Sequence, residues 1–216
     1  MSIAAIMPCR GRAAQTIENV RRLLATAGHD DTTLICACDG DEVVYHALED
    51  AIGGRCNPVL LDGPQGYWRV LSNFRPQDER FLWCNLANDL WACDDWLRFA
   101  VEDYRAAFSG GDGLLGFSGD GHGYGHSCHF LISRGLLERY GGWPVWYSHN
   151  FGDRELCERA QQDGCYAKST RAWLEHCHPM LGRADDDAVY QAGRATYRQD
   201  EALFVARRAA GWPKTG

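Results

Sequence analysis

The chain has 216 residues, of which 45% are hydrophobic and 24% are charged, and its formal net charge is −7. This composition is that of a globular protein and excludes a wholly disordered chain. The acidic excess argues against a broad nucleic-acid-binding face. No apolar run approaches the ~20 residues that span a bilayer. Arg10 and Arg12 interrupt the opening apolar stretch, so we expect no secretory signal and a cytoplasmic location.

Strand-like and helical patterns alternate through the first half of the chain. The predicted strands are Ile3–Met7, Thr33–Cys38, Val59–Leu61 and Arg80–Leu86. The predicted helices are Ala13–Ala27, Glu42–Ala51, Tyr67–Phe74 and Asp94–Phe108, the last with Asp94 as its N-cap. Because such alternation requires crossover connections, it predicts an α/β fold with a mostly parallel central sheet flanked by helices.

The second half departs from this rhythm. The segment Gly110–Gly125 is rich in glycine and gives no strand pattern. Strands are predicted at Cys128–Ser133 and Thr170–His176, and helices at Gly135–Tyr140 and Asp153–Gln162. We expect one domain, with a nucleotide-binding half at 1–110, an acceptor or catalytic half at 111–190 and a C-terminal helix at 191–216. The basic side chains of this last segment are expected on a solvated helix face; they are Arg194, Arg198, Arg207, Arg208 and Lys214.

Polar residues follow three of the predicted strands. Pro8, Arg10 and Arg12 follow the first, Asp39 and Asp41 the second, and Asn88 and Asp89 the fourth. Ligands of open α/β sheets bind at the carboxyl ends of the strands. An Asp-Gly pair often serves only to make a turn, and each group taken singly has that alternative. Together they favour a binding cleft.

Two further segments carry groups suited to metal binding and acid–base chemistry. Asp89 stands at a strand end, where a hard divalent cation would share it with substrate phosphates. His176 and His178 would point to the same face of a strand, and either would reach a metal in the cleft, although such pairs are more often surface residues. Asp153 opens a predicted helix, where it is a candidate base or simply an N-cap.

The ten cysteines form no C-x-x-C pair and are scattered through apolar segments. We therefore expect them to be reduced thiols that serve as small core residues. One loop combines histidine and cysteine in a set that could hold zinc, and its members are His122, His126, Cys128 and His129. Their spacing matches no known zinc framework, so a polar, glycine-rich loop is the favoured interpretation and the role of these histidines stays open.

Taken in order from Ile3 to about Tyr190, these segments resemble the inverting GT-A glycosyltransferases, particularly compact family 2-like enzymes of bacteria and phages. The resemblance implies a GT-A (nucleotide-diphospho-sugar transferase) fold. The segment Ile6–Arg12 looks like the nucleotide-contacting turn, and Cys38–Asp41 like the turn that contacts base or ribose. The pair Asn88–Asp89 falls at the metal motif, and Phe130–Arg134 looks like the lining of the sugar pocket.

The resemblance also implies roles for the remaining candidates. Asp153 falls at the catalytic base, which would take a proton from an acceptor hydroxyl in a single displacement with inversion. Asp89 with His176 or His178 would bind Mn²⁺ or Mg²⁺, and Arg10 or Arg134 would stabilise the departing phosphates. Asn88 and Gly152 depart from the family pattern, because acidic residues are expected at both positions.

The implied function is metal-dependent transfer of a sugar from a nucleotide-sugar, with UDP-sugars favoured, in a bacterial cell or an infected host cell. The acceptor would be a glycan, a small molecule or a phage-type modified DNA base such as 5-hydroxymethylcytosine, with no membrane partner. Aromatic faces able to stack on it are offered by Tyr124, Trp143, Trp146 and Tyr147. The alternatives are a sugar-phosphate nucleotidyltransferase and a non-catalytic nucleotide-sugar-binding module.

Overall fold

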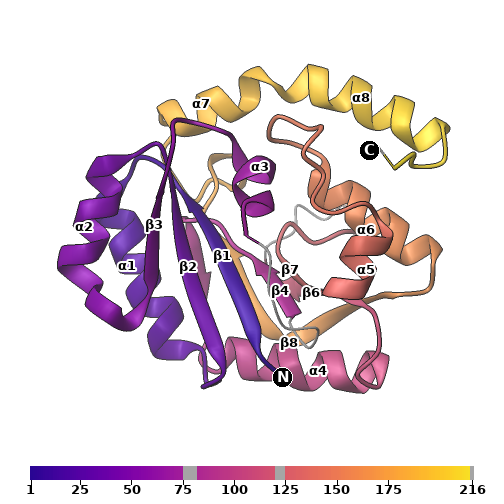
Figure 1. The fold of residues 1–216 in the computed structure, drawn as a ribbon, viewed down its shortest axis with the longest axis horizontal. Helices are drawn as coiled ribbons and strands as arrows, with labels where there is room; N and C mark the ends of the chain where they lie inside the picture. The colour runs from indigo at the N-terminus through magenta and orange to yellow at the C-terminus, as the bar shows by residue number, and fades with distance from the viewer. Residues whose placement is uncertain (75–81, 120–124, 215–216) are drawn as a thin grey trace.

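A computed structural model describes residues 1–74, 82–119 and 125–214, and within them an eight-stranded sheet carries helices on both faces (Figure 1). The strand order is β3-β2-β1-β4-β7-β6-β8-β5. The pairings among β1 to β4 are parallel, as is β6 with β8, whereas β4–β7, β6–β7 and β5–β8 are antiparallel. The expected α/β fold with helices flanking a central sheet is therefore confirmed, and the sheet is mixed, with three antiparallel pairings besides its parallel ones.

The first half follows the predicted order of strands and helices closely. The strands are β1 (Ile3–Cys9), β2 (Thr32–Asp39), β3 (Asn57–Leu61) and β4 (Leu82–Asn85). The helices are α1 (Ala13–Thr26), α2 (Glu42–Ile52), α3 (Tyr67–Ser72) and α4 (Trp96–Phe108), with a short 3-10 turn at Gly53–Arg55. Residues 80 and 81 of the predicted fourth strand lie outside the described residues.

The expectation that Asp94 caps α4 is wrong. The residue before the helix is Asp95, which has a left-handed backbone with φ 57°, and no side chain caps the first turn. Its carboxylate instead accepts a hydrogen bond from Arg98 at 2.7 Å, one turn into the helix. The helix is stabilised here by packing of its apolar face, including buried Trp96 and Leu97.

A strand that the sequence did not predict, β5 (Leu90–Ala92), lies between β4 and α4. The second half contains β6 (Leu114–Ser118), β7 (Phe130–Ser133) and β8 (Tyr166–His176). Its helices are α5 (Arg134–Arg139), α6 (Gly152–Gln162), α7 (Ala188–Ala195) and α8 (Tyr197–Ala209), with a 3-10 turn at Pro179–Leu181. The expected single C-terminal helix is thus two helices, which meet at Thr196.

The strand β6 lies inside the glycine-rich segment that gave no strand pattern. Gly116 is needed in the middle of this strand, because a Cβ there would lie 2.2 Å from the Oγ of Ser127. Neighbouring strand residues Leu114, Leu115 and Phe117 are fully buried. The glycine therefore marks a close approach of two chain segments rather than a break in the sheet.

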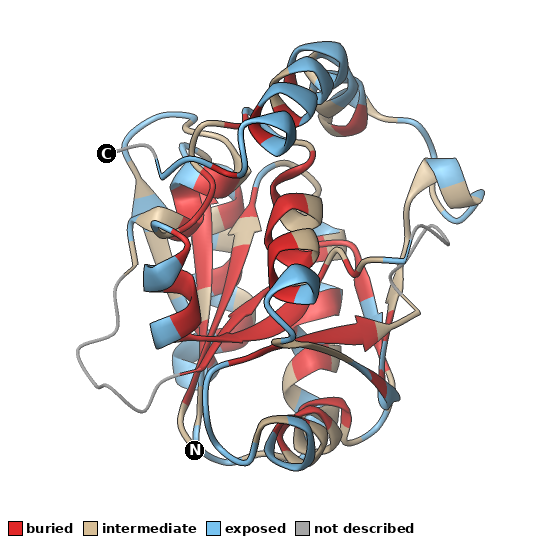
Figure 2. Ribbon diagram, turned by 90° about the vertical axis from the view of Figure 1, so that its right-hand side faces the viewer, coloured by how far each residue is buried: buried red, intermediate tan, exposed pale blue. Residues whose placement is uncertain are grey.

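Buried apolar side chains form two clusters, one on each face of the sheet (Figure 2). One packs beneath α1, α2 and α4 and includes Val20, Leu48 and Val101; the other packs beneath α3, α5, α6 and α8 and includes Trp68 and Phe204. The strand β1 is buried along almost its whole length, since helices cover both of its faces. All ten cysteines are free thiols. Among the described residues, no helix has the length and apolar character needed to cross a membrane.

A buried ion pair attaches α8 to α6. The carboxylate of Glu155, which is 0% exposed, accepts hydrogen bonds from Arg207 Nε at 2.8 Å and Arg207 Nη2 at 2.9 Å. Glu155 also accepts hydrogen bonds from Tyr147 at 2.8 Å and Arg159 at 3.2 Å. Arg207 is therefore a core residue, and the expectation of a wholly solvated basic face on the C-terminal helix is corrected.

We predict that Arg207→Met lowers the free energy of unfolding by about 3 kcal/mol, because it leaves a buried carboxylate with fewer partners. The matched control is Arg208→Met, one residue along the helix. Arg208 is exposed and pairs with Glu158 at 3.0 Å, so its replacement should change stability by less than ~1 kcal/mol. Urea unfolding of the two variants and the wild type measures the difference. Equal losses would mean that the buried pair does not hold α8 in place.

Candidate functional site

The candidate site lies at the carboxyl edge of the parallel strands. Since β1, β2 and β4 run in the same direction, the residues that follow them gather at this edge. In Figure 1 the edge is at the top, where α7 passes over the strand ends. The C-terminal quarter of the chain thus returns to cover the residues that follow the first strands.

Asp89 is the central residue of this edge. It is 4% exposed, and its Oδ1 lies 3.3 Å from Nε2 of His176. Its Oδ2 lies 3.6 Å from a guanidinium nitrogen of Arg12. Burial by itself would raise the pKa of Asp89, but the charge and hydrogen bond of His176 and the hydrogen bond of Tyr190 outweigh it. The pKa of Asp89 therefore lies well below its ordinary value, and the carboxylate is ionised.

Two residues of the α7 region contact Arg12 and Asp89: Asp187, which caps the helix, and Tyr190, which lies within it. The guanidinium of Arg12 makes a two-point ion pair with Asp187, at 2.5 and 2.7 Å, and lies 3.7 Å from the ring centre of Tyr190. The hydroxyl of Tyr190 lies 2.7 Å from Oδ2 of Asp89 and 2.7 Å from the carbonyl oxygen of Cys177. A hydroxyl has one proton to donate, so it serves one of these two acceptors at a time.

The predicted histidine pair lies here, but only one member adjoins Asp89. His176 ends β8 and pairs with Leu90 of β5, directly after Asp89. His178 is beyond the strand, where its Nδ1 accepts the backbone N–H of Met180 at 3.2 Å and its ring packs against Tyr190. The ring of buried His129 lies 5.1 Å from that of His176.

A hard divalent cation fits the Asp89–His176 pair. Mg²⁺ and Mn²⁺ take oxygen ligands from one or two carboxylates and from substrate phosphates, and imidazole nitrogen is an accepted partner for transition metals. The pair offers one carboxylate and one imidazole at the same point of the edge. Such a cation would neutralise negative charge on a phosphate leaving group.

Asn88, next to Asp89, faces into the fold. Its side-chain amide donates to the Oγ1 of Thr16 at 3.0 Å, and its backbone carbonyl oxygen accepts from the side-chain amide of Asn19 at 2.5 Å. Thr16 and Asn19 are both buried on α1. Asn88 therefore joins α1 to the end of the sheet, and Asp89 is the acidic group at this strand end.

Two aspartates at the carboxyl end of β2 form hydrogen bonds with backbone amides: Asp39 is the last residue of the strand, and Asp41 precedes α2. Asp39 accepts from the N–H groups of Gln65 at 2.6 Å and Gly66 at 3.0 Å, ahead of α3. Asp41 caps α2 through Val44 at 3.0 Å and accepts the N–H of Gly11 at 2.7 Å. These carboxylates therefore fix the loops that surround the edge.

The candidates on and after β1 differ in exposure. Pro8 is half-buried and pairs with Ala37 inside the sheet, whereas Arg10 is exposed directly after the strand. Arg134 is not part of this site. Ser133, which precedes it, pairs with Leu82 at the amino end of β4, so the length of β4 separates Arg134 from Asp89. Arg134 forms an ion pair with Glu138 at 2.6 Å along α5.

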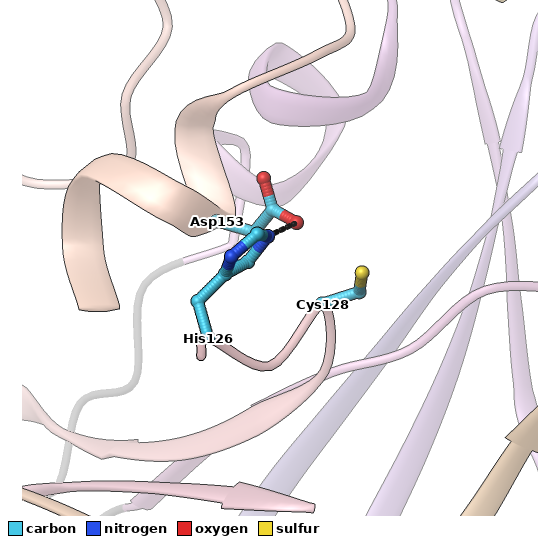
Figure 3. Close-up of side chains that lie close together, drawn as sticks. All are labelled: His126, Cys128 and Asp153. Atoms are coloured by element: carbon cyan, nitrogen blue, oxygen red, sulfur yellow. Dashed lines mark ion pairs between the residues drawn. The ribbon is translucent and has the colours of Figure 1, made fainter. Parts of the chain in front are cut away.

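Asp153 lies in the first turn of α6 and is not its N-cap. The helix begins after Phe151, which has φ 69°, and no side chain caps its first turn. The carboxylate of Asp153 instead faces His126, with 3.9 Å between Oδ2 and Nε2, and Cys128 lies close by (Figure 3). The alternative in which Asp153 only caps a helix is thus excluded. His122 and Tyr124 lie outside the described residues.

A steric constraint explains the glycine at position 152. A Cβ at this position would lie 2.3 Å from the ring of Trp68 and 2.6 Å from Pro144. Any side chain here, including the acidic one expected from the family pattern, would require the core to move. The absence of an acidic residue at 152 therefore follows from packing against Trp68.

Of the aromatic residues considered as stacking platforms, two are buried in the core and a third, Trp146, is half-buried against it. Trp143 and Tyr147 are 5% and 2% exposed. Trp146 donates to Glu155 at 3.2 Å and lies under the guanidinium of Arg207. The exposed tryptophans among the described residues are Trp91 and Trp173, on the paired strands β5 and β8.

Sequence reasoning missed several residues that organise the site. Asn85, at the end of β4, is fully buried; it donates to the carbonyl of Cys128 at 2.9 Å and accepts the N–H of Phe130 at 2.9 Å. Asp187 and Tyr190 were missed because they lie about 100 residues or more from Asp89 along the chain. Of these residues, only Asn85 could have been recognised from the sequence, because it is a polar residue at the end of a predicted strand.

The described fold is similar to solved glycosyltransferase structures. The mannosyltransferase PcManGT from Pyrobaculum calidifontis, in complex with GDP-Man and Mn²⁺, matches over 96% of this chain with a TM-score of 0.66 and 15% identity. S. aureus TarS matches over 82% with a TM-score of 0.56 and 12% identity, and its fragment 1–349 with UDP over 81% with a TM-score of 0.58 and 12% identity.

The chain spans 64%, 36% and 60% of the length of these three structures, respectively. No protein-family model and no curated protein matches the sequence. The similarity therefore lies in the fold. The chain has a GT-A-like glycosyltransferase fold.

Proposed function

We propose that this protein is a metal-dependent glycosyltransferase that uses a nucleotide-sugar donor. The observation that carries the proposal is the buried, ionised Asp89 beside His176 at the carboxyl edge of a glycosyltransferase-like sheet. Burying a carboxylate without compensating partners costs free energy of folding, so buried carboxylates in proteins have charged or hydrogen-bonding partners or bind a cation. Here Arg12, His176 and Tyr190 surround it.

Asp89 and His176 would hold Mn²⁺ or Mg²⁺ together with the donor diphosphate. The bound cation would supply charge neutralisation at the departing phosphate. Exposed Arg10 stands at the end of β1, where it would meet the same diphosphate. Arg12 already has Asp187 and Asp89 as partners, so its role toward the donor would be to hold Asp89 ionised and in place.

Asp153 would act as the base. It lies in the first turn of α6 and makes no capping bond that its loss or gain of a proton would disrupt. It would accept the proton of an acceptor hydroxyl as that oxygen attacks the anomeric carbon opposite the leaving nucleoside diphosphate, with inversion.

The acceptor belongs to the chemical class of hydroxyl compounds, which includes glycans, small molecules and hydroxymethylated bases. A UDP-sugar and a GDP-sugar are both candidates for the donor. A panel of nucleotide-sugars, tested by thermal shift with Mn²⁺ present, identifies the base and the sugar. Stabilisation that depends on both metal and diphosphate is the expected result.

The metal prediction is that release of nucleoside diphosphate requires added Mn²⁺ or Mg²⁺. Asp89→Asn keeps the shape of the side chain but removes its charge, and it should weaken metal-dependent donor binding by more than about 10-fold. Asp95→Asn is the control, because Asp95 is a surface carboxylate just beyond β5. Donor titration by calorimetry measures both variants, with thermal unfolding to confirm that they fold. Full turnover in excess chelator would contradict the proposal.

The base prediction concerns Asp153→Asn. Asparagine cannot accept the proton, and general base catalysis typically contributes ~10²–10⁴-fold, so kcat for transfer should fall by about that factor. Donor affinity should stay near that of the wild type, because the base contacts the acceptor. Asp163→Asn, at the other end of the same helix, is the control and should leave kcat within a few-fold. A protein that binds donor with metal but never transfers or hydrolyses the sugar would be a binding module.

A further inference from the structure

A second cluster of metal-ligating side chains shares no member with the Asp89–His176 pair. His126, Cys128 and Asp153 each offer one ligand atom, and these atoms all lie within 4.8 Å of one another (Figure 3). The three side chains are half-buried. The set combines an imidazole, a thiol and a carboxylate, which differs from the oxygen-rich sets that Mg²⁺ prefers.

The spacing suits a tetrahedral ion. With Zn–N near 2.0 Å and Zn–S near 2.3 Å, two ligands of one tetrahedral zinc lie roughly 3.3–3.8 Å apart. His126 Nε2 and Asp153 Oδ2 are 3.9 Å apart, which is too long for a hydrogen bond but close to this separation. Binding would require the three ligand atoms, which lie within 4.8 Å of one another, to move closer to a common centre.

The backbone around the cluster is held firmly. The carbonyl of Cys128 accepts from buried Asn85 at 2.9 Å, and the carbonyl of Gly125 accepts from Gln161 of α6 at 2.9 Å. Ser127 is fully buried, and its carbonyl accepts from Cys157 of α6 at 3.4 Å. The loop that bears His126 and Cys128 is therefore attached to the helix that bears Asp153. The backbone that carries the three ligands is therefore held in place before any ion binds, and this lowers the entropic cost of binding.

We propose that His126, Cys128 and Asp153 form a zinc site with an open fourth position. Thiolate and imidazole ligands select Zn²⁺ over Mg²⁺, and three protein ligands with an open position are typical of zinc sites that are not purely structural. On binding, the S–H bond of Cys128 breaks, its proton passes to the solvent, and the sulfur lone pair forms the bond to zinc. No oxidant or reductant is needed.

Zinc at this site would inhibit sugar transfer, and this part of the inference rests on the proposed function. A carboxylate of Asp153 that is bonded to zinc cannot accept a proton from the acceptor. Mn²⁺ at Asp89 and Zn²⁺ at Asp153 would then have opposite effects on the same reaction. The protein would be active with a hard cation and inactive when a soft one occupies the second site.

The binding test uses the full-length protein and Co²⁺ as the probe. Cobalt bound to a cysteine thiolate gives a sulfur-to-metal charge-transfer band, and tetrahedral geometry gives intense visible bands. We expect both bands in the wild type and in Asp89→Asn, and neither in Cys128→Ser. The matched control is Cys165→Ser, a half-buried cysteine that lies outside the cluster and should leave the bands unchanged. Absence of a thiolate band in folded wild type would overturn the proposal, as would its persistence in Cys128→Ser.

The affinity and inhibition tests separate this site from the proposed activity. His126→Ala and Cys128→Ser should each weaken zinc binding at this site by about 100-fold or more, as measured by competition with a chromophoric chelator. The concentration of Zn²⁺ that halves each variant's own transfer rate should rise by a similar factor. Zinc binding without any transfer activity would overturn only the proposed function. Transfer with Mn²⁺ but no thiolate–cobalt band would overturn only the zinc site.

Discussion

The burial of one carboxylate, that of Asp89, is the constraint on which the site depends. A charge in this position must be compensated by groups that the local sequence does not contain. Arg12 comes from the loop after β1, His176 from the end of β8 and Tyr190 from α7. The compensation therefore joins the first strand, the last strand and the C-terminal helices at one point of the sheet edge. The same point is where a metal and a diphosphate would meet.

The C-terminal helices also determine where the proposed base lies. Asp200, buried on α8, accepts hydrogen bonds from the consecutive N–H groups of Ser148, His149 and Asn150 at 2.8 to 2.9 Å. These residues immediately precede α6, which begins at Gly152 and carries Asp153. Together with the buried pair of Glu155 and Arg207, these bonds fix the start of α6 relative to the sheet. A segment that looks like a basic surface appendage in the sequence is thus part of the scaffold of the site.

The two departures from the family pattern have different physical explanations. Gly152 is required because the ring of Trp68 occupies the space of any side chain there. Asn88 uses its neutral amide to bind Thr16 on α1, a bond to which a carboxylate could contribute only as an acceptor. Beside these positions, Asp153 faces His126 and Asp89 faces His176. Departures next to a reactive group can therefore reflect packing without loss of that group.

The sequence alone determined the order of strands and helices in the first half except for the short strand β5, because apolar periodicity is a local property that does not depend on the neighbouring segments. It also singled out Asp89, His176 and Asp153 as candidates, since polar residues at strand and helix ends stand out against apolar runs. It did not reveal β6, because Gly116 looks like a loop residue until Ser127 packs against it. Only the tertiary structure decided that Arg134 lies at the far edge, that Tyr190 reaches Asp89, and that Cys128 lies beside Asp153. These outcomes depend on strand direction and on contacts between distant segments, which no local pattern encodes.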